Sequence, residues 1–360
     1  MNERNESKLI NWLKKYKRLI IGLITIILII LIVIFVDFSN LITNLFKIGL
    51  WGTLFFILIY TVAFLLRAYK VKLIFKGLNQ PIKFSSSYFS IGASFLINDL
   101  TPGQLGDIAK VLILKDQEDM RLSESFAGIA VERVLDLLLL FSISCFALIY
   151  LYMTNISELE KNILLGQNLQ FYLLIGAILI VIVLILFLIS FYKQDFVVKI
   201  MNKVSKKLGD YLDRFLRNFK NGLKKFKDHK KEFLYVILLN IPTYIIDAFI
   251  VVIFFIFSGY NLNIFIIILA TLVLFFSKII PITPGGWAIS ELIGAFFIKI
   301  FYPEIELEMI LSIFVIDHFL RTAYVLLYGG YSILHYNFKL KEARKILDKN
   351  NQLEIIDKQK

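Results

Sequence analysis

From Gln170 to Tyr192 the chain reads QFYLLIGAILIVIVLILFLISFY, a run of mostly apolar residues without a single acidic or basic side chain. A helix needs roughly 20 apolar residues to cross the hydrocarbon of a bilayer, and this run meets that length. Leu19 to Val36 supplies 18 more uncharged residues, and Phe233 to Phe257 is of similar length. Hydrophobic residues make up 58% of the 360-residue chain, against roughly 45–50% in soluble domains. The sequence therefore predicts an all-α integral membrane protein.

Lys and Arg are concentrated in alternate segments between the apolar runs. Six precede residue 19, five lie in 67–83, thirteen in 193–232 and seven follow residue 335. Segments 37–47 and 154–168 hold one each, and 258–263 holds none. Because cytoplasmic loops are enriched in Lys and Arg, the rich segments are predicted inside, with cytoplasmic ends at 1–18 and 336–360. We interpret the net charge of +12 as a topology signal and expect no nucleic-acid partner.

This alternation predicts six full spans and two broken stretches, eight hydrophobic segments in all. The spans are 19–36, 48–66, 124–153, 169–192, 233–257 and 309–335. Stretch 84–114 is broken by Asn98-Asp-Leu-Thr-Pro-Gly-Gln-Leu-Gly-Asp107, and stretch 263–301 by Pro281-Ile-Thr-Pro-Gly-Gly286. Two crossings and a turn need about 40 residues, so we predict a re-entrant helical hairpin for each. The second stretch is long enough that two crossings would also fit.

The order span, span, hairpin, span occurs twice, in residues 19–153 and in residues 169–335, which the outside loop 154–168 joins. The charge pattern makes the first hairpin enter from the cytoplasm and the second from outside, so the halves would be an inverted repeat. Both hairpins turn at Thr-Pro-Gly, residues 101–103 and 283–285. Broken segments at matching positions of inverted halves point to a transporter's binding site. A chance match between two ordinary Pro–Gly loops is the alternative.

Each Thr-Pro pair is predicted to start a half-helix, because Thr is a favoured N-cap and Pro is favoured at the first helical position. The half-helices would run from Thr101-Pro102 to about Leu114 and from Thr283-Pro284 to about Ile300. Helix N-termini attract anions, and glycine lets a ligand approach the backbone closely. We therefore expect the two ends to hold one anionic headgroup between them. The alternative is that the glycines only permit tight packing of the hairpins.

Ionisable side chains inside the spans are costly in lipid and usually functional. Arg133 and Arg321 are candidates to pair with a lipid phosphate. Five acids could pair with these arginines or relay protons: Glu132, Asp136, Asp247, Glu291 and Asp317. Residues four apart share a helical face, as Glu132 and Asp136 do, and Asp317 and Arg321 could simply neutralise each other. A structural salt bridge is the alternative for each of these residues.

The predicted substrate-binding residues come from both breaks and from the spans that follow them. They are Asn98, Thr101, Pro102, Gly103, Gly106, Asp107, Glu132, Arg133, Asp136, Lys278, Thr283, Pro284, Gly285, Gly286, Glu291, Asp317 and Arg321.

The usual catalytic and metal-binding patterns are absent from the sequence. Histidines occur only at 229, 318 and 335, which is not a metal-ligand spacing. The single cysteine, Cys145, allows neither a disulfide framework nor a cysteine zinc site. No Gly-x-Ser-x-Gly elbow occurs and no Walker loop follows either break. We therefore expect no cofactor and no metal, and hydrolysis is not supported.

The segment 193–232 carries apolar residues at helical spacing from Val197 to Phe226 among its thirteen basic residues. This pattern predicts a basic amphipathic helix. Such a helix would lie on the anionic cytoplasmic face of the membrane. A solvated connector is the alternative interpretation.

Five motifs, in order, resemble those of the lysylphosphatidylglycerol synthase transmembrane family, the flippase-like membrane domain. They are Arg67-Ala-Tyr-Lys70, Asn98 to Asp107, Val131-Glu-Arg-Val-Leu-Asp136, Pro281-Ile-Thr-Pro-Gly-Gly-Trp-Ala-Ile-Ser-Glu291, and Arg321-Thr-Ala-Tyr324 with Gly329-Gly330 after it. The resemblance covers about residues 10 to 335. It departs at Trp287, where a smaller aliphatic residue is more usual, and at Ala288, where glycine is common. Both departures bear on substrate size or close packing at that turn.

In the two-part members of this family, a membrane domain of this kind moves aminoacylated phospholipid between leaflets, and a soluble domain makes that lipid from charged tRNA. Only residues 336–360 follow the last predicted span, so we expect no synthase activity from this chain. The resemblance implies translocation of an anionic or aminoacylated phospholipid, or of a lipid-linked intermediate, across the cytoplasmic membrane.

Two alternatives to translocation stay open. One is a membrane-embedded transferase that acts on a lipid-linked substrate, with Glu132 or Glu291 as its base. The other is a non-catalytic partner of a separate lipid-modifying enzyme, which would dock on the basic helix 197–226.

Overall fold

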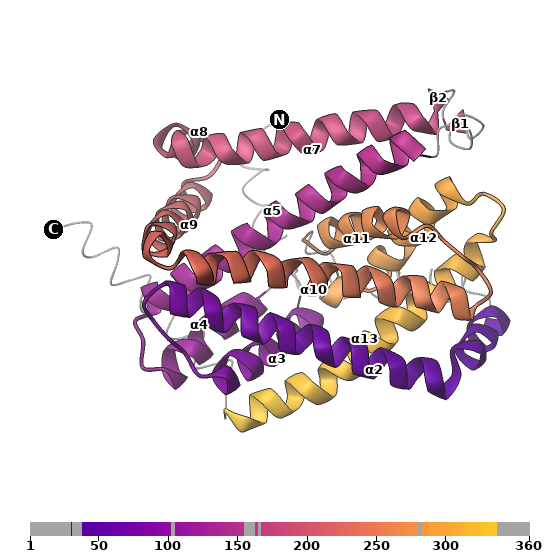
Figure 1. Cartoon of the computed structure of the whole chain (residues 1–360), viewed down its shortest axis with the longest axis horizontal. Helices are drawn as coiled ribbons and strands as arrows, with labels where there is room; N and C mark the ends of the chain where they lie inside the picture. Colours follow the sequence, from indigo (N-terminus) through magenta and orange to yellow (C-terminus); the bar gives the residue numbers. More distant parts are fainter. Residues whose placement is uncertain are drawn as a thin grey trace, which may run out of the picture. The chain divides into compact units, whose positions relative to one another are not determined.

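The computed structural model describes residues 38–101, 105–154, 163–164, 167–279 and 283–336, together with Ile30. Almost all of these residues are helical (Figure 1). The α-helices are α2 Phe38–Gly77, α3 Phe84–Leu100, α4 Gly106–Gln117, α5 Leu122–Thr154, α7 Leu169–Tyr192, α8 Gln194–Val204, α9 Lys206–Lys225, α10 Lys230–Phe257, α11 Ile264–Ile279, α12 Ile289–Phe301 and α13 Leu307–His335. Two single 3-10 turns, η1 Phe226–Asp228 and η2 Pro284–Gly286, and the antiparallel two-residue strands β1 Ile163–Leu164 and β2 Gln167–Asn168 complete the described chain.

Five described segments are long and apolar enough to cross a membrane. They are Phe38–Gly77, Leu122–Thr154, Lys230–Phe257, Pro284–Phe301 and Leu307–His335. α7 adds 24 residues without a charge. Five of the six predicted spans therefore correspond to α2, α5, α7, α10 and α13, and the first, 19–36, lies outside the described residues apart from Ile30. The protein is an all-α polytopic membrane protein, as the sequence predicts.

Both broken stretches form two helices with a break between them. α3 and α4 hold 17 and 12 residues, which is about 26 Å and about 18 Å of helix. α11 and α12 hold 16 and 13 residues, or about 24 Å and about 20 Å. Each arm is shorter than the hydrocarbon layer of about 30 Å, as a re-entrant hairpin requires. The segment Pro284–Phe301 reaches the length of a span only because it includes η2.

The boundary of the second predicted span is wrong, because α2 continues through the supposed loop 67–83 as far as Gly77. Arg67 and Lys70 therefore lie within a helix, and Lys70 is almost fully buried. Helix continues there because both cations have carboxylate partners inside the protein, Asp247 for Arg67 and Asp136 for Lys70. Near its start, α2 bends at Gly49, whose backbone φ of 56° is readily adopted only by glycine.

The chain forms two compact units that interleave along the sequence. Unit 1 comprises residues 1–55, 98–104 and 248–322, and unit 2 comprises residues 56–97, 105–247 and 323–360. Each unit takes segments from both predicted halves, 19–153 and 169–335. The first Thr-Pro-Gly break falls in unit 1 together with the second break.

Large apolar side chains cover the outward faces of the long helices. In unit 2, α7 packs on α5 through Leu173 and Ile180 and leaves most of its other apolar residues exposed. In unit 1, Phe46 and Trp51 of α2 are about four-fifths exposed, at 80% and 81%. Apolar faces on this scale are not left in contact with water by monomeric soluble proteins. They are the faces that contact lipid.

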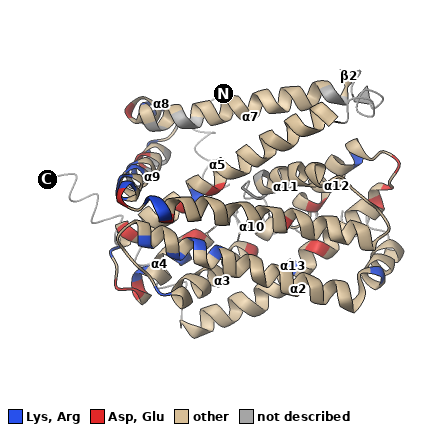
Figure 2. Cartoon of the chain, in the orientation of Figure 1, with Lys and Arg blue, Asp and Glu red and all other residues tan. Residues whose placement is uncertain are grey.

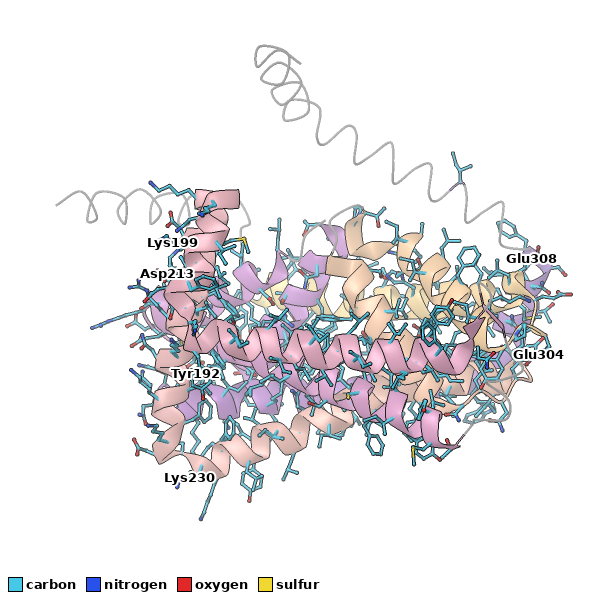
Figure 3. The ribbon with its side chains drawn as sticks, turned by 90° about the horizontal axis from the view of Figure 1, so that it is seen from above. Tyr192, Lys199, Asp213, Lys230, Glu304 and Glu308 are labelled. Atoms are coloured by element: carbon cyan, nitrogen blue, oxygen red, sulfur yellow. The ribbon has the colours of Figure 1, made fainter. Side chains whose placement is uncertain are left out.

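The basic segment is two helices and not the single helix predicted for residues 197–226. α8 ends at Val204, Ser205 is extended with φ −159° and ψ 120°, and α9 begins at Lys206. Figure 3 follows this segment from Tyr192 through Lys199 and Asp213 to Lys230. Lys and Arg are concentrated on α9, whereas α7 carries none (Figure 2). Ser205 favours an interruption because serine competes for helical hydrogen bonds.

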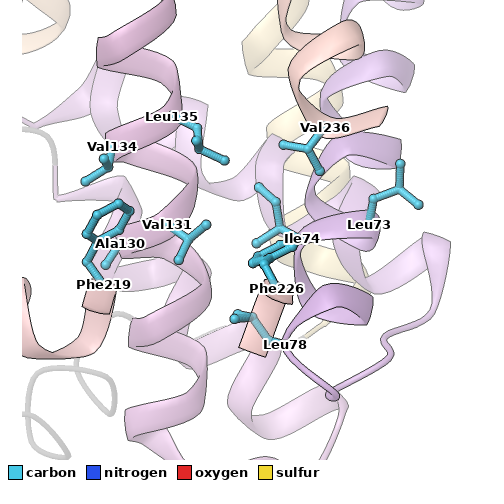
Figure 4. Close-up of a cluster of buried hydrophobic side chains, with 10 residues drawn as sticks. All are labelled: Leu73, Ile74, Leu78, Ala130, Val131, Val134, Leu135, Phe219, Phe226 and Val236. Carbon is cyan, nitrogen blue, oxygen red and sulfur yellow. The ribbon is translucent and has the colours of Figure 1, made fainter. Parts of the chain in front are cut away.

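The apolar face of α9 packs inside unit 2. Phe219 of α9 and Phe226 of η1 are buried with Ile74 of α2, Val131 of α5 and their neighbours (Figure 4). Glycines permit this close approach: a side chain at Gly77 would overlap the Phe226 ring, and one at Gly222 would lie 2.6 Å from Val131 Cγ2. The basic face of α9 lies on the outside of unit 2.

Replacing Phe226 with Ala should release this packing, because removing a buried phenyl ring costs roughly 3–5 kcal/mol. The matched control is Phe196→Ala on α8, whose side chain is mostly exposed. Trypsin digestion of the detergent-solubilised protein measures the difference, since the segment holds many Lys and Arg residues. We expect faster cleavage in Phe226→Ala only. Equal cleavage of both variants would show that α9 is not held by this cluster.

Candidate functional site

The first break separates α3 from α4 at Thr101, and residues 102–104, including Pro102 and Gly103, lie outside the described residues. Asn98 is in the last turn of α3, and Gly106 is the first residue of α4. The predicted helix start at Thr101-Pro102 is wrong, since Leu105 holds the N-cap position without a side-chain cap. Asp107 stands in the first turn of α4. A carboxylate there interacts favourably with the helix dipole, so the helix does not require a threonine cap.

The second break is an irregular turn between α11 and α12. Thr283 is extended, η2 occupies Pro284–Gly286, and α12 begins at Ile289, five residues after the predicted start. Gly285, Gly286 and Ala288 all have positive φ, at 63°, 80° and 72°. An alanine in this conformation costs about 1–2 kcal/mol, yet Ala288 is fully buried. The packing around the turn therefore enforces a backbone that cannot continue as helix.

The two breaks touch each other within unit 1. A Cβ atom at Gly285 would lie 3.1 Å from the Asp99 carbonyl oxygen and 3.3 Å from the Asp99 Cα. The Thr322 hydroxyl of α13 also donates to Asp99 Oδ2 at 3.3 Å. The end of α3, the η2 turn and the middle of α13 thus converge. We call this group the break cluster; its members are Asp99, Thr283, Gly285, Trp287, Glu291, Asp317, His318, Arg321 and Thr322.

A buried acid and a buried histidine form the polar centre of the break cluster. Glu291, in the first turn of α12, bonds through its carboxylate to His318 Nδ1 of α13. The two residues are only 2% and 5% exposed. The Trp287 ring lies flat on the imidazole, with centroids 4.1 Å apart and planes at 8°. Among the described residues, the buried side-chain atoms without a hydrogen-bond partner include three of the break cluster: Thr283 Oγ1, Glu291 Oε2 and His318 Nε2.

Asp317 and Arg321 pair with each other on α13, as the sequence suggested they could. Arg321 Nε donates to both carboxylate oxygens, at 2.8 and 2.9 Å. Both side chains are mostly buried. This pair contributes no net charge to the break cluster. The side chain of Lys278, at the end of α11, lies outside the described part of the structure.

The other predicted ionisable residues form a separate network in unit 2. Lys110 of α4 pairs with Glu132 at 2.5 Å, and Arg133 Nε donates to Asp107 at 2.6 Å. Asp136 pairs with Lys70 of α2 at 2.5 Å.

The network links four helices through balanced charges. Lys70 also donates to the Asn240 side chain of α10 at 2.9 Å. Three cations of α2, α4 and α5 face three anions of α4 and α5. Glu132 and Asp136 lie on one face of α5 as predicted, and both point toward lysines of other helices. Since the charges balance and Lys70, Lys110, Glu132 and Asp136 are buried, the arrangement ties helices together.

Sequence reasoning missed several members of these groups. Lys70 was counted as a loop residue, Lys110 and Asn240 were not considered, and His318 was considered only as a metal ligand. His318 and Lys110 could be identified from the sequence by one signal: an ionisable residue inside an apolar helix is costly and is usually functional or paired. Among the described residues, no cluster of three or more His, Cys, Asp or Glu side chains could hold a metal ion.

Replacing Lys110 with Met should strongly destabilise the protein, because Glu132 would be left as an unpaired buried charge at a cost of roughly 3–5 kcal/mol. The double variant Lys110→Met/Glu132→Leu should recover most of that loss. Lys115→Met is the matched control, since Lys115 pairs with Asp116 near the surface and such pairs contribute about 1 kcal/mol or less. Apparent melting temperatures in detergent measure all three. A Lys110→Met protein as stable as Lys115→Met would contradict the structural role.

Comparison with known proteins agrees with this architecture. The family model described as lysylphosphatidylglycerol synthase TM region matches residues 19–329. The chain is also similar to UPF0104 membrane protein MJ1078 of Methanocaldococcus jannaschii, with 27% identity over 206 residues, which is 57% of this chain and 79% of that relative. No solved structure matches the chain. The family match takes in both breaks and the helices that carry the charged residues, and the chain therefore belongs to the lysylphosphatidylglycerol synthase transmembrane family.

Proposed function

We propose that this protein moves a phospholipid or lipid-linked intermediate with an anionic or aminoacylated headgroup between the leaflets of the cytoplasmic membrane. The headgroup passes through the break cluster, and both chain termini face the cytoplasm. The observation that carries the proposal is the contact between the two helix breaks, at Gly285 and Asp99. Family membership supports a membrane-lipid role.

The break cluster contains irregular backbone, which is costly in a membrane. Inside hydrocarbon, each amide or carbonyl group without a partner costs several kcal/mol, so irregular backbone is tolerated only within protein or beside a polar cavity. The η2 turn with Gly285 and Gly286 is such backbone, and it lies between the apolar helices α11 and α12. A polar headgroup beside this turn can form hydrogen bonds with its backbone groups, which lipid tails cannot do.

The side chains of the break cluster extend this polar surface. Thr283 Oγ1 and His318 Nε2 are buried without a partner in the part of the chain that the structure describes. A buried polar atom without a partner costs about 1–3 kcal/mol. A headgroup phosphate that accepts from the Thr283 hydroxyl, and a headgroup hydroxyl that donates to His318 Nε2, would remove that cost, so these atoms favour a polar ligand over a hydrocarbon one.

In this proposal Arg321 supplies the counter-charge for the headgroup phosphate. Guanidinium binds carboxylate and phosphate with the same two-pronged geometry. The phosphate would therefore take the place of the Asp317 carboxylate on Arg321 while the lipid is bound. Arg133, the other arginine that the sequence suggests as a counter-charge, pairs with Asp107 in unit 2 and has no part in the break cluster.

Gly285→Ala tests the contact between the breaks. The added methyl group would lie 3.1 Å from the Asp99 carbonyl oxygen, and the residue would keep a φ of 63°. Gly259→Ala is the matched control, because Gly259 also has positive φ, at 97°, but nothing lies within 4 Å of its added methyl group. Both variants share the backbone strain, and only Gly285→Ala disturbs the break cluster.

The assay uses liposomes with acyl-labelled fluorescent phosphatidylglycerol, an aminoacylated analogue and a polyisoprenyl phosphate, and an impermeant quencher that reaches only the outer leaflet. We expect the natural sequence and Gly259→Ala to flip at least one probe, and Gly285→Ala to be slower by about tenfold or more, which corresponds to about 1.4 kcal/mol at the barrier. Folded protein that flips none of the probes would contradict the proposal. A lipid product of altered mass would instead support the transferase interpretation.

A further inference from the structure

The Glu291–His318 pair has a charge that depends on one proton. With Nδ1–H donated to the Glu291 carboxylate, a neutral His318 leaves the pair with one negative charge, and Nε2 carries a lone pair. A proton added at Nε2 converts the pair into an imidazolium–carboxylate ion pair without net charge. Because both residues are buried, the neutral state avoids an uncompensated charge in a low-dielectric site.

The Trp287 ring lies parallel to the imidazole at 4.1 Å, and the face of an aromatic ring, above all that of tryptophan, attracts a cation.

The other charged groups of the break cluster have partners of their own. On α13, Asp317 pairs with Arg321, and at the first break Asp99 accepts the Thr322 hydroxyl. On α11, which packs against α12, residues 264–277 carry no charge and Lys278 has no described side chain. Protonation of His318 thus determines the charge of the pair.

We propose that His318 Nε2 is a proton-binding site and that lipid flipping through the break cluster is coupled to proton movement at this atom, an inference that rests on the proposed function. A hydroxyl or ammonium group of the headgroup that donates to His318 Nε2 uses the same lone pair as the proton. Proton and headgroup therefore compete, and each weakens the binding of the other by the same factor. The proton bound on one side is released on the other, in exchange for one lipid.

A fluorescence titration tests the proton site without any transport. The chain has three tryptophans, Trp12, Trp51 and Trp287, so Trp12→Phe/Trp51→Phe leaves Trp287 as the only reporter, and imidazolium quenches indole at contact distance. In nanodiscs we expect the emission to fall on acidification, because protonation gives the stacked imidazole a charge. His318→Gln should abolish this pH dependence, whereas His229→Gln and His335→Gln should keep it. An emission independent of pH in the parent protein would overturn the site.

A pH gradient across liposomes tests the coupling. With one proton exchanged per lipid, each pH unit supplies about 1.36 kcal/mol. Acyl-labelled phosphatidylglycerol should therefore become enriched up to about tenfold in the leaflet facing the acidic compartment. An ionophore that exchanges protons for potassium should remove the enrichment, and His318→Gln should show none.

The outcomes separate the inference from the proposed function. Flipping that reaches equal leaflet populations despite the gradient would overturn the coupling and leave the proposed function in place. Enrichment in the leaflet facing the basic compartment would overturn the competition between proton and headgroup. If folded protein flips none of the probes, the proposed function fails, and the Trp287 titration still decides whether His318 binds a proton.

Discussion

A bilayer does not tolerate a helix break unless the freed backbone groups find polar partners, and this chain has two such breaks at Thr-Pro-Gly. The structure meets the constraint by placing them against each other, with the Asp99 backbone beside Gly285. Glycine is favoured at that position, since a side chain would be crowded against the Asp99 backbone and the φ is positive. Three further features occur together with this contact. The helices on either side of each break are short, Ala288 has a positive φ, and the two breaks converge on α13.

The buried charged side chains are paired differently in the two units. In unit 2, three cations and three anions of α2, α4 and α5 pair with one another, so the charged residues bind helices together. In unit 1, Asp317 and Arg321 neutralise each other, while Glu291 and His318 form a pair whose charge depends on a proton. Buried polar atoms of this pair still lack partners among the described residues. This difference is why we assign the network in unit 2 to stability and the break cluster to function.

The fold was largely predictable, because hydropathy and Lys/Arg distribution are strong signals in membrane proteins. The described spans and the helix–break–helix pattern of both broken stretches agree with the prediction from sequence. Errors came where tertiary partners override local preference. α2 continues past Arg67 because Asp247 and Asp136 neutralise its cations. α4 starts late with a first-turn acid in place of the expected threonine cap, and α12 starts late because Gly285, Gly286 and Ala288 have positive φ.

The site was less predictable than the fold. The glycines, Glu291 and Arg321 are identifiable from motifs, but the pairing of Glu291 with His318 joins residues 27 positions apart, and sequence spacing does not reveal it. The contact between Gly285 and Asp99 likewise depends on how two distant hairpins pack.

The most direct test of a headgroup site is to label it with a phospholipid that carries a photoreactive group on its headgroup. After irradiation in nanodiscs, mass spectrometry of the digested protein identifies the attached peptides. The account predicts labelling of Thr283 to Glu291 and of the peptide around Asp99, and competition by unlabelled lipid. Labelling confined to the exposed apolar faces, such as that of α7, would contradict it.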